Sequence, residues 1–277
     1  MAGILVTAAL AALSAASLPA SSADRAAANP AIFVVRDADT TVYIFGTFHA
    51  LDAKPDWFND KVRGAFERSD ELVLETLVPE RPGPAMLSGA AAQLPGRPLA
   101  VTPSASFLAS TRMAIDAGRS RGMQVDNGAD MVLRRVAESE GKPVEGLETL
   151  ESQIAMFSRM PPAPTAAALP VKVAVAAAAR PGAALNSLSQ SMAEMQSAWK
   201  HGDQTVFRQI LGELEQDSPA TYRMMFTERN GRWADWIRAR MQTPGTVFVA
   251  VGAGHLVGRD SVLVKLAQLG IPSARVN

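Results

Sequence analysis

Two glycine-x-x-histidine tetrads lie near opposite ends of the chain, and each directly follows an apolar run. The tetrads are Gly46-Thr47-Phe48-His49 and Gly252-Ala253-Gly254-His255, and they hold two of the 3 histidines. The runs before them, 42–45 and 247–251, are rich in β-branched or aromatic residues, as buried parallel strands tend to be. A glycine lets the backbone turn sharply at a strand end, so we expect both histidines at the carboxyl edge of a sheet, where open α/β folds bind ligands. The pair is therefore a candidate metal site.

A carboxylate is expected to join the two histidines. Glu75 ends the apolar run 71–75, so a parallel strand would carry it to the same edge, whereas Glu71 would lie at the opposite edge. Two imidazoles and a carboxylate suit zinc, manganese, cobalt or iron and leave positions open for water, which the metal would acidify into a nucleophile. Glu75 is equally suited to act as the general base, since either role needs only a carboxylate near the metal-bound water.

Each of these residues also has an ordinary structural interpretation. A lone histidine is more often a satisfied polar side chain than a ligand, but two in the same local context are hard to attribute to packing, which does not require imidazole. Glu75 alone would be a solvated strand end. Arg229, in Thr227-Glu228-Arg229-Asn230, would ordinarily be a surface charge on a helix. If that helix packs over the sheet edge, its guanidinium would instead hold a substrate carboxylate or a developing oxyanion.

In the first half of the chain that follows residue 23, the sequence pattern predicts strands that alternate with helices. Runs 32–35 and 41–45 flank a polar turn and indicate a β-hairpin. Apolar residues at helical spacing predict a helix over 57–69, and 71–75 follows as a strand, which favours a parallel pair. A loop with a short helix is expected over 79–103. The predicted elements beyond it are a helix over 131–140, a strand at 143–146 and a helix that begins at Thr149.

The second half predicts a helical block of residues 151–241, inserted before the last strand. Within it, 161–182 is rich in alanine and proline, 185–200 carries one apolar helix face, and further helices are expected over 204–214 and 219–241. A strand at 246–251, a helix at 260–269 and a short strand at 273–276 complete the chain. The fold class is therefore α/β, with a mixed, mainly parallel sheet built from N- and C-terminal strands, in a single domain of residues 24–277.

The composition limits the class of partner, and the N-terminal segment predicts the cellular location. Of the 277 residues, 48% are hydrophobic, and 27 basic side chains balance 27 acidic ones, which argues against a nucleic-acid binder and favours a peptide or small-molecule substrate. Residues 1–23 combine an apolar stretch with a small-residue end, Ser21-Ser22-Ala23, and predict a signal peptide, hence a secreted or periplasmic protein with no stable membrane span after cleavage. Because there are no cysteines, any metal must be held by His, Asp or Glu.

The motifs as a set resemble the TraB/GumN family, which is related to the Tiki group of metal-dependent peptidases. The resemblance rests on the following segments: Tyr43-Ile44-Phe45-Gly46-Thr47-Phe48-His49, Leu72-Val73-Leu74-Glu75, Gly146-Leu147-Glu148-Thr149, Trp199-Lys200-His201-Gly202-Asp203, Glu228-Arg229-Asn230 and Val251-Gly252-Ala253-Gly254-His255-Leu256-Val257-Gly258. It implies a fold similar to erythromycin esterase and the haem-binding ChaN proteins. It also implies an active centre of the two tetrads and Glu75, with Gly46 and Gly252 against a bound cofactor and Arg229 in support. Asp126 and Asp130 match the family only loosely, and their role is open.

The sequence therefore predicts an exported divalent-metal-dependent hydrolase, best interpreted as a peptidase. His49, His255 and Glu75 would hold a manganese, cobalt or zinc ion, and Arg229 would position the substrate. The alternative is a non-catalytic binding module of the cell envelope that takes haem, a metal ion or a polysaccharide-related ligand on the same fold. In a third interpretation the tetrads serve only to turn strands, but the joint presence of both histidines and Glu75 argues against it.

Overall fold

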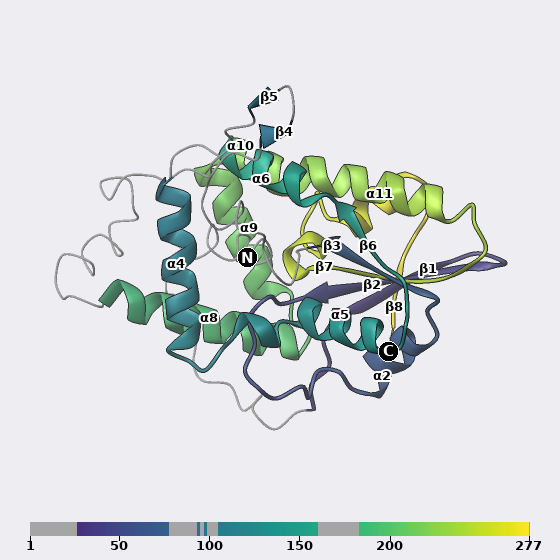
Figure 1. Cartoon of the computed structure of the whole chain (residues 1–277), viewed down its shortest axis with the longest axis horizontal. Helices are drawn as coiled ribbons and strands as arrows, with labels where there is room; N and C mark the ends of the chain where they lie inside the picture. The colour runs from purple at the N-terminus through teal and green to yellow at the C-terminus, as the bar shows by residue number, and fades with distance from the viewer. Residues whose placement is uncertain (1–26, 78–92, 95–96, 99–104, 160–182, 277) are drawn as a thin grey trace.

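One mixed β-sheet with helices on both faces forms the centre of the molecule (Figure 1). The computed structural model describes residues 27–77, 93–94, 97–98, 105–159 and 183–276. The described strands are β1 (Ile32–Arg36), β2 (Thr40–Thr47), β3 (Glu71–Thr76), β4 (Gln93–Leu94), β5 (Arg97–Pro98), β6 (Val144–Glu148), β7 (Gly245–Gly252) and β8 (Ala274–Arg275). The described α-helices are α2 (Asp60–Glu67), α4 (Ala105–Arg119), α5 (Ala129–Ser139), α6 (Leu150–Ser158), α8 (Ala183–Lys200), α9 (Thr205–Asp217), α10 (Pro219–Tyr222), α11 (Glu228–Arg240) and α12 (Val262–Gln268). Shorter helical segments are η3 (Val125–Asn127), the π-helical η5 (Arg223–Thr227) and η6 (Ala253–Leu256).

The sheet has the strand order β6-β3-β7-β2-β1-β8. The four strands β6, β3, β7 and β2 are mutually parallel, whereas β1 is antiparallel to both β2 and β8. Strand β7, from the C-terminal part of the chain, therefore lies between β2 and β3. This placement puts the carboxyl ends of β2, β7 and β3 side by side at one edge.

The alternation of side chains along each central strand divides the core into two layers. On one face, Val247, Val249 and Val251 of β7 pack with Trp233 and Ile237 of α11 and with residues of α12. On the other face, Phe248 and Ala250 join the larger cluster, to which α2, α5, α8 and α9 contribute. Both faces of the sheet are thus covered, which explains why the central strands are almost continuously apolar.

A network of aromatic rings connects the strand β2 to the helical block. The ring of Phe45 lies 5.7 Å from Trp57, 6.2 Å from Trp199 and 5.8 Å from Phe248, between ring centroids. The indole Nε1–H of Trp199, on α8, donates to the carbonyl oxygen of Gly46 at 2.7 Å. Helix α8 is therefore held directly against the strand end that leads to His49.

Most predicted elements are confirmed, with two corrections. The helix predicted over 57–69 begins only at Asp60, because the side chain of Asn59 caps it by accepting from the Val62 amide. The strands β2 and β3 are parallel, but they are not a pair, because β7 lies between them. Helix α4 has no counterpart among the predicted elements.

Several other predictions are not tested by the structure. The signal peptide, the alanine-rich segment and most of the predicted 79–103 loop lie outside the described residues. Within the described part of the chain, no helix is both long enough and apolar enough to cross a membrane.

Replacement of the central ring should destabilise the fold. We expect Phe45→Ala to lower the free energy of unfolding by about 3–5 kcal/mol, because it removes a fully buried ring from a dense aromatic cluster. On the same strand, Tyr43→Phe keeps the ring and should cost less than about 1 kcal/mol. Urea unfolding followed by tryptophan fluorescence measures both. Equal losses in the two variants would show that the cluster is not a principal source of stability.

Candidate functional site

The two tetrads lie side by side at the carboxyl ends of β2 and β7. The parallel register pairs Gly46 with Val251 and Thr47 with Gly252. His49 follows β2 by two residues, and His255 lies in η6, which continues directly from β7. Both histidines are buried, with exposed fractions of 6% and 0%. The third histidine, His201, is half-buried, and its Nδ1 lies 2.8 Å from the carbonyl oxygen of Ser197, four residues earlier in the chain.

The tetrad glycines provide space at the strand ends. The glycines with positive φ in the described chain do not include Gly46 or Gly252, so the chain passes from β7 into η6 at Gly252 without a left-handed residue. A Cβ on Gly46 would lie 3.2 Å from Cα of Ala253. A Cβ on Gly252 would lie 3.2 Å from Nε2 of His49 and 3.5 Å from Oε2 of Glu75. Gly252 thus lets the imidazole and the carboxylate approach the same point, and its predicted contact with a cofactor stays a prediction.

Glu75 reaches this point from the neighbouring strand β3. Leu74 pairs with Ala250, so the next residue extends beside the end of β7. The Gly252 amide donates to Oε2 of Glu75 at 3.2 Å, and Nε2 of Gln153 donates to Oε1 at 3.3 Å. Glu71 lies at the opposite end of β3, where it pairs with Arg240 at 2.8 Å. Strand direction therefore separates the two glutamates as predicted.

Arg229 is fully buried beneath the strand ends and connects two carboxylates. Its Nη2 lies 2.6 Å from Oε1 of Glu75, and its Nε donates to Oε2 of Glu148 at 2.9 Å. Burial by itself would raise the pKa of Glu75, but Arg229 and the two nearby histidines hold that pKa well below its ordinary value. Burial by itself would lower the pKa of Arg229, and the two carboxylates raise it instead. Arg229 and Glu75 therefore form a buried ion pair, and Glu148 contacts the same guanidinium from the other strand.

Helix geometry directs Arg229 toward the site. The π-helical η5 immediately precedes α11, and its Met225 carbonyl accepts from Nη1 of Arg229 at 3.4 Å. π-helical turns change the direction in which the following side chains project and are frequent at functional sites. Trp233, one turn further along α11, lies against the guanidinium at 4.6 Å from the ring centroid.

His255 is held as a neutral ring. Its Nδ1 lies 2.6 Å from Oδ1 of Asn230, whose Nδ2 donates to the Asp260 carbonyl. Because the amide oxygen of Asn230 is the acceptor, Nδ1 carries the hydrogen and Nε2 carries the lone pair. That lone pair faces Nη1 of Arg229 at 3.4 Å. Burial, together with Arg229 and His49, lowers the pKa of His255 to about 3, against the opposing effect of Glu75.

His49 has the opposite electrostatic setting. Its Nδ1 lies 3.2 Å from Oδ1 of Asp130, at ion-pair distance but without the alignment of a hydrogen bond. Burial by itself would lower the pKa of His49, yet Asp130 and Glu75 raise it above its ordinary value. Neither ring nitrogen has a hydrogen-bond partner among the described residues. Of the two buried histidines, His49 is therefore the one whose ring nitrogens are available to bind a ligand.

Unpaired polar atoms gather around one cavity beside Glu75. Six buried side-chain atoms without a hydrogen-bond partner belong to residues that line it: Thr47 Oγ1, His49 Nδ1, His49 Nε2, Thr76 Oγ1, Asp130 Oδ1 and Gln153 Oε1. The cavity measures about 30 Å³, and a water molecule needs about 10–15 Å³. It therefore has room for water next to His49 and Glu75, with polar atoms available to bind it.

The donors fit a divalent ion in part. Nε2 of His49 has no partner, and Oε2 of Glu75 lies on the same side of Gly252. His255 is only 4.0 Å from Glu75, between Nε2 and Oε2, but its lone pair is directed at Arg229. Among the described residues, no group of three His, Cys, Asp or Glu side chains has a spacing that could hold a metal ion. The predicted trio of ligands therefore stays a prediction, with His49 and Glu75 as its better-fitting members.

Four further residues complete the site. Asp130 faces His49, and Asn230 orients His255. Gln153 donates to Glu75, and Glu148 pairs with Arg229. Glu148 and Asn230 stand inside motifs that carried the family resemblance, which is the sequence signal that could have found them. Asp130 stands in a stretch that matches the family only loosely, and Gln153 carries no such signal. The roles of both depend on where α5 and α6 pack.

Comparison with known proteins gives a match to a family model. A family model described as the TraB/PrgY/gumN family matches the chain over residues 31–105 and 84–274. No curated protein and no solved structure matches it significantly.

Removal of the Asp130 charge should lower the pKa of His49. We expect Asp130→Asn to shift the ring titration to lower pH, because the carboxylate is the principal group that raises it. A histidine with a raised folded pKa stabilises the fold below its unfolded pKa, and this contribution is lost as the pH rises through the folded value. The variant should therefore lose stability mainly below about pH 6.5. Imidazole NMR titration and urea unfolding at two pH values measure this. An unchanged His49 titration would contradict it.

Proposed function

The chain belongs to the TraB/PrgY/gumN family, and from this premise and the site geometry we propose that it is an exported, divalent-metal-dependent hydrolase that acts on peptide bonds. The observation that carries the proposal is the convergence of His49 and Glu75, from two different strands, on a cavity with unpaired polar atoms and room for water. A buried imidazole without partners is costly to a fold that does not use it. Export rests on the apolar segment of residues 1–23 and its small-residue end.

Each side chain of the site has a different role in the proposed hydrolysis. Asp130 lies at ion-pair distance on the Nδ1 side of the His49 ring, while Nε2 lies on the side of Gly252 and Glu75. Glu75 stays ionised at neutral pH because its pKa is strongly lowered. This favours a ligand or charge-stabilising role over that of a general base, whose pKa should lie near the working pH. Asp130 Oδ1 and Gln153 Oε1 line the cavity as acceptors that orient the hydrogens of a water molecule.

The ion would be held by His49 and Glu75. When bound, it supplies the Lewis acidity that lowers the pKa of a coordinated water and polarises the substrate carbonyl. Arg229, locked between Glu75 and Glu148, fixes the carboxylate orientation and is not free to move toward a substrate. This differs from the substrate-positioning role that the sequence suggested. His255 is neutral, donates to Asn230 through Nδ1 and contacts Nη1 of Arg229 through Nε2.

A second function is a non-catalytic binding module of the cell envelope. The observation that favours it is the static character of the Arg229 network, in which Glu75 is held ionised by a guanidinium instead of being poised near neutral pH. Such a module would take up a ligand at the cavity without turnover. Cleavage assays separate the two functions directly.

Loss of the carboxylate should abolish hydrolysis. We expect Glu75→Gln to lower kcat/KM on a mixture of short acetylated peptides by about a hundredfold or more, because the charge that faces His49 is removed. New amino groups released from the peptides are the readout. Glu71→Gln, on the same strand but at the opposite edge, is the matched control and should leave the rate unchanged. No peptide cleavage by the unaltered protein, with ligand uptake intact, would favour the binding module.

His49 and Glu75 should hold the metal ion. We expect the unaltered protein to bind one Mn²⁺ or Zn²⁺ in calorimetric titration, and His49→Ala to weaken binding by about a hundredfold. Protons compete for the ring of His49, so affinity should fall by about tenfold per pH unit below its raised pKa. His201→Ala, which removes a histidine outside the site, is the control. Equal affinity in the His49 and His201 variants would remove the metal from the proposal.

A further inference from the structure

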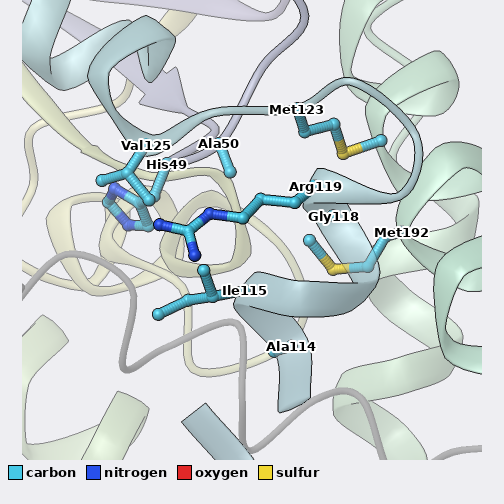
Figure 2. Close-up of a pocket in the computed structure, with 9 residues that line it drawn as sticks. All are labelled: His49, Ala50, Ala114, Ile115, Gly118, Arg119, Met123, Val125 and Met192. Carbon is cyan, nitrogen blue, oxygen red and sulfur yellow. The ribbon is translucent and has the colours of Figure 1, made fainter. Parts of the chain in front are cut away.

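A second, largely apolar hollow lies against His49, distinct from the cavity that Glu75 lines. Its walls come from the segment after β2, from α4, from the loop that leads to η3, and from α8 (Figure 2). The apolar surface is provided by Ile115, Met123, Val125 and Met192, with small residues between them. His49 is the one residue shared by this hollow and the Glu75 cavity. The imidazole therefore separates a polar space from an apolar one.

The apolar hollow opens into a wider one at the surface. The two share Arg119, Met123 and Val125, and the wider hollow adds Gly122, Gln124 and Asp126. The narrow part beside His49 measures about 10 Å³ and the wider part about 290 Å³. The narrow part thus accepts a group of about the size of a methyl, while the wider part is close to the lower limit for small-ligand pockets.

Arg119 is the one arginine or lysine among the residues that line these two hollows. It extends from the end of α4, and Figure 2 shows its guanidinium directed toward the end of the hollow where His49 lies. The side chain is 69% exposed, and its ion pair with Asp116 is long, at 3.8 Å between Nη1 and Oδ1. An exposed pair at that distance contributes little, so the guanidinium is available to a ligand. Asp126, an exposed acid at the rim, disfavours a doubly charged anion.

From this arrangement we propose that the two hollows bind the carboxy-terminal residue of a peptide substrate. Arg119 pairs with its free carboxylate, and the narrow part beside His49 takes a small side chain such as that of alanine. A planar guanidinium matches a carboxylate with two parallel hydrogen bonds, and apolar walls strengthen that pairing by excluding water. The peptide bond before the bound residue then lies at His49, facing the water cavity.

This inference rests on the proposed hydrolase function and narrows it to removal of carboxy-terminal residues. In that reaction the C–N bond of the last peptide bond breaks and a C–O bond to the water oxygen forms. One water proton leaves with the amine. No oxidant or co-reactant is required.

Binding of matched probes tests the inference without any need for turnover. The probes are N-acetyl-L-alanine, which carries a free carboxylate, and N-acetyl-L-alanine N-methylamide, which is neutral. We expect NMR titration of the full-length protein to give at least about tenfold tighter binding of the acid. Arg119→Gln should abolish the difference and Arg119→Lys should keep part of it. Arg121→Gln, an exposed arginine two residues further on that lines neither hollow, is the matched control and should change nothing.

The outcomes distinguish this inference from the proposed function. Preferential binding of the acid, lost in Arg119→Gln but without peptide cleavage, supports the carboxylate site and removes the hydrolase. Cleavage of acetylated tri-alanine and of its carboxy-terminal amide at equal rates keeps the hydrolase and overturns the carboxylate site. Equal or absent binding of both probes to the unaltered protein also overturns the carboxylate site. Circular dichroism confirms that the exposed Arg119 variants are folded.

Discussion

The buried charge network of Arg229 with Glu75 and Glu148 is the interaction on which the site depends. A fully buried guanidinium is tolerated only because two carboxylates compensate it, and removal of one partner leaves an uncompensated charge that costs several kcal/mol. The network also joins three elements, since Glu75 lies one residue before the end of β3, Glu148 ends β6 and Arg229 lies on α11. The position of the carboxylate beside the histidines is therefore fixed by electrostatics and not only by the backbone.

Two histidines in the same sequence context acquire opposite properties from their neighbours. His255 meets a guanidinium and an amide oxygen, which keep it neutral, whereas His49 meets the carboxylate of Asp130 and keeps a higher proton affinity. His49 also lies between a polar cavity and an apolar hollow. One imidazole is thus suited to support the network, and the other is suited to face a ligand.

Much of the fold follows from local patterns. The hairpin of β1 and β2, the strand β7 and the apolar face of α8 were predictable, because buried strands appear as short apolar runs and a buried helix face repeats apolar residues at helical spacing. The insertion of β7 between β2 and β3 was not, because strand order depends on long-range pairing that leaves no local signature. The start of α2 at Asp60 depends on the Asn59 cap, which competes with the apolar pattern that begins at Trp57.

The convergence of the two histidines and the glutamate follows from local sequence patterns. His49 and His255 follow the ends of β2 and β7, Glu75 lies one residue before the end of β3, and parallel strands bring their carboxyl ends to one edge. The contacts that set the charge and orientation of these side chains come from long-range packing. The tautomer of His255, the pairing of Arg229 and the contact of Asp130 with His49 depend on atoms that approach within about 4 Å from helices far away in the chain. Strand direction is encoded locally, whereas charge, lone-pair direction and cavity shape arise from packing between distant segments.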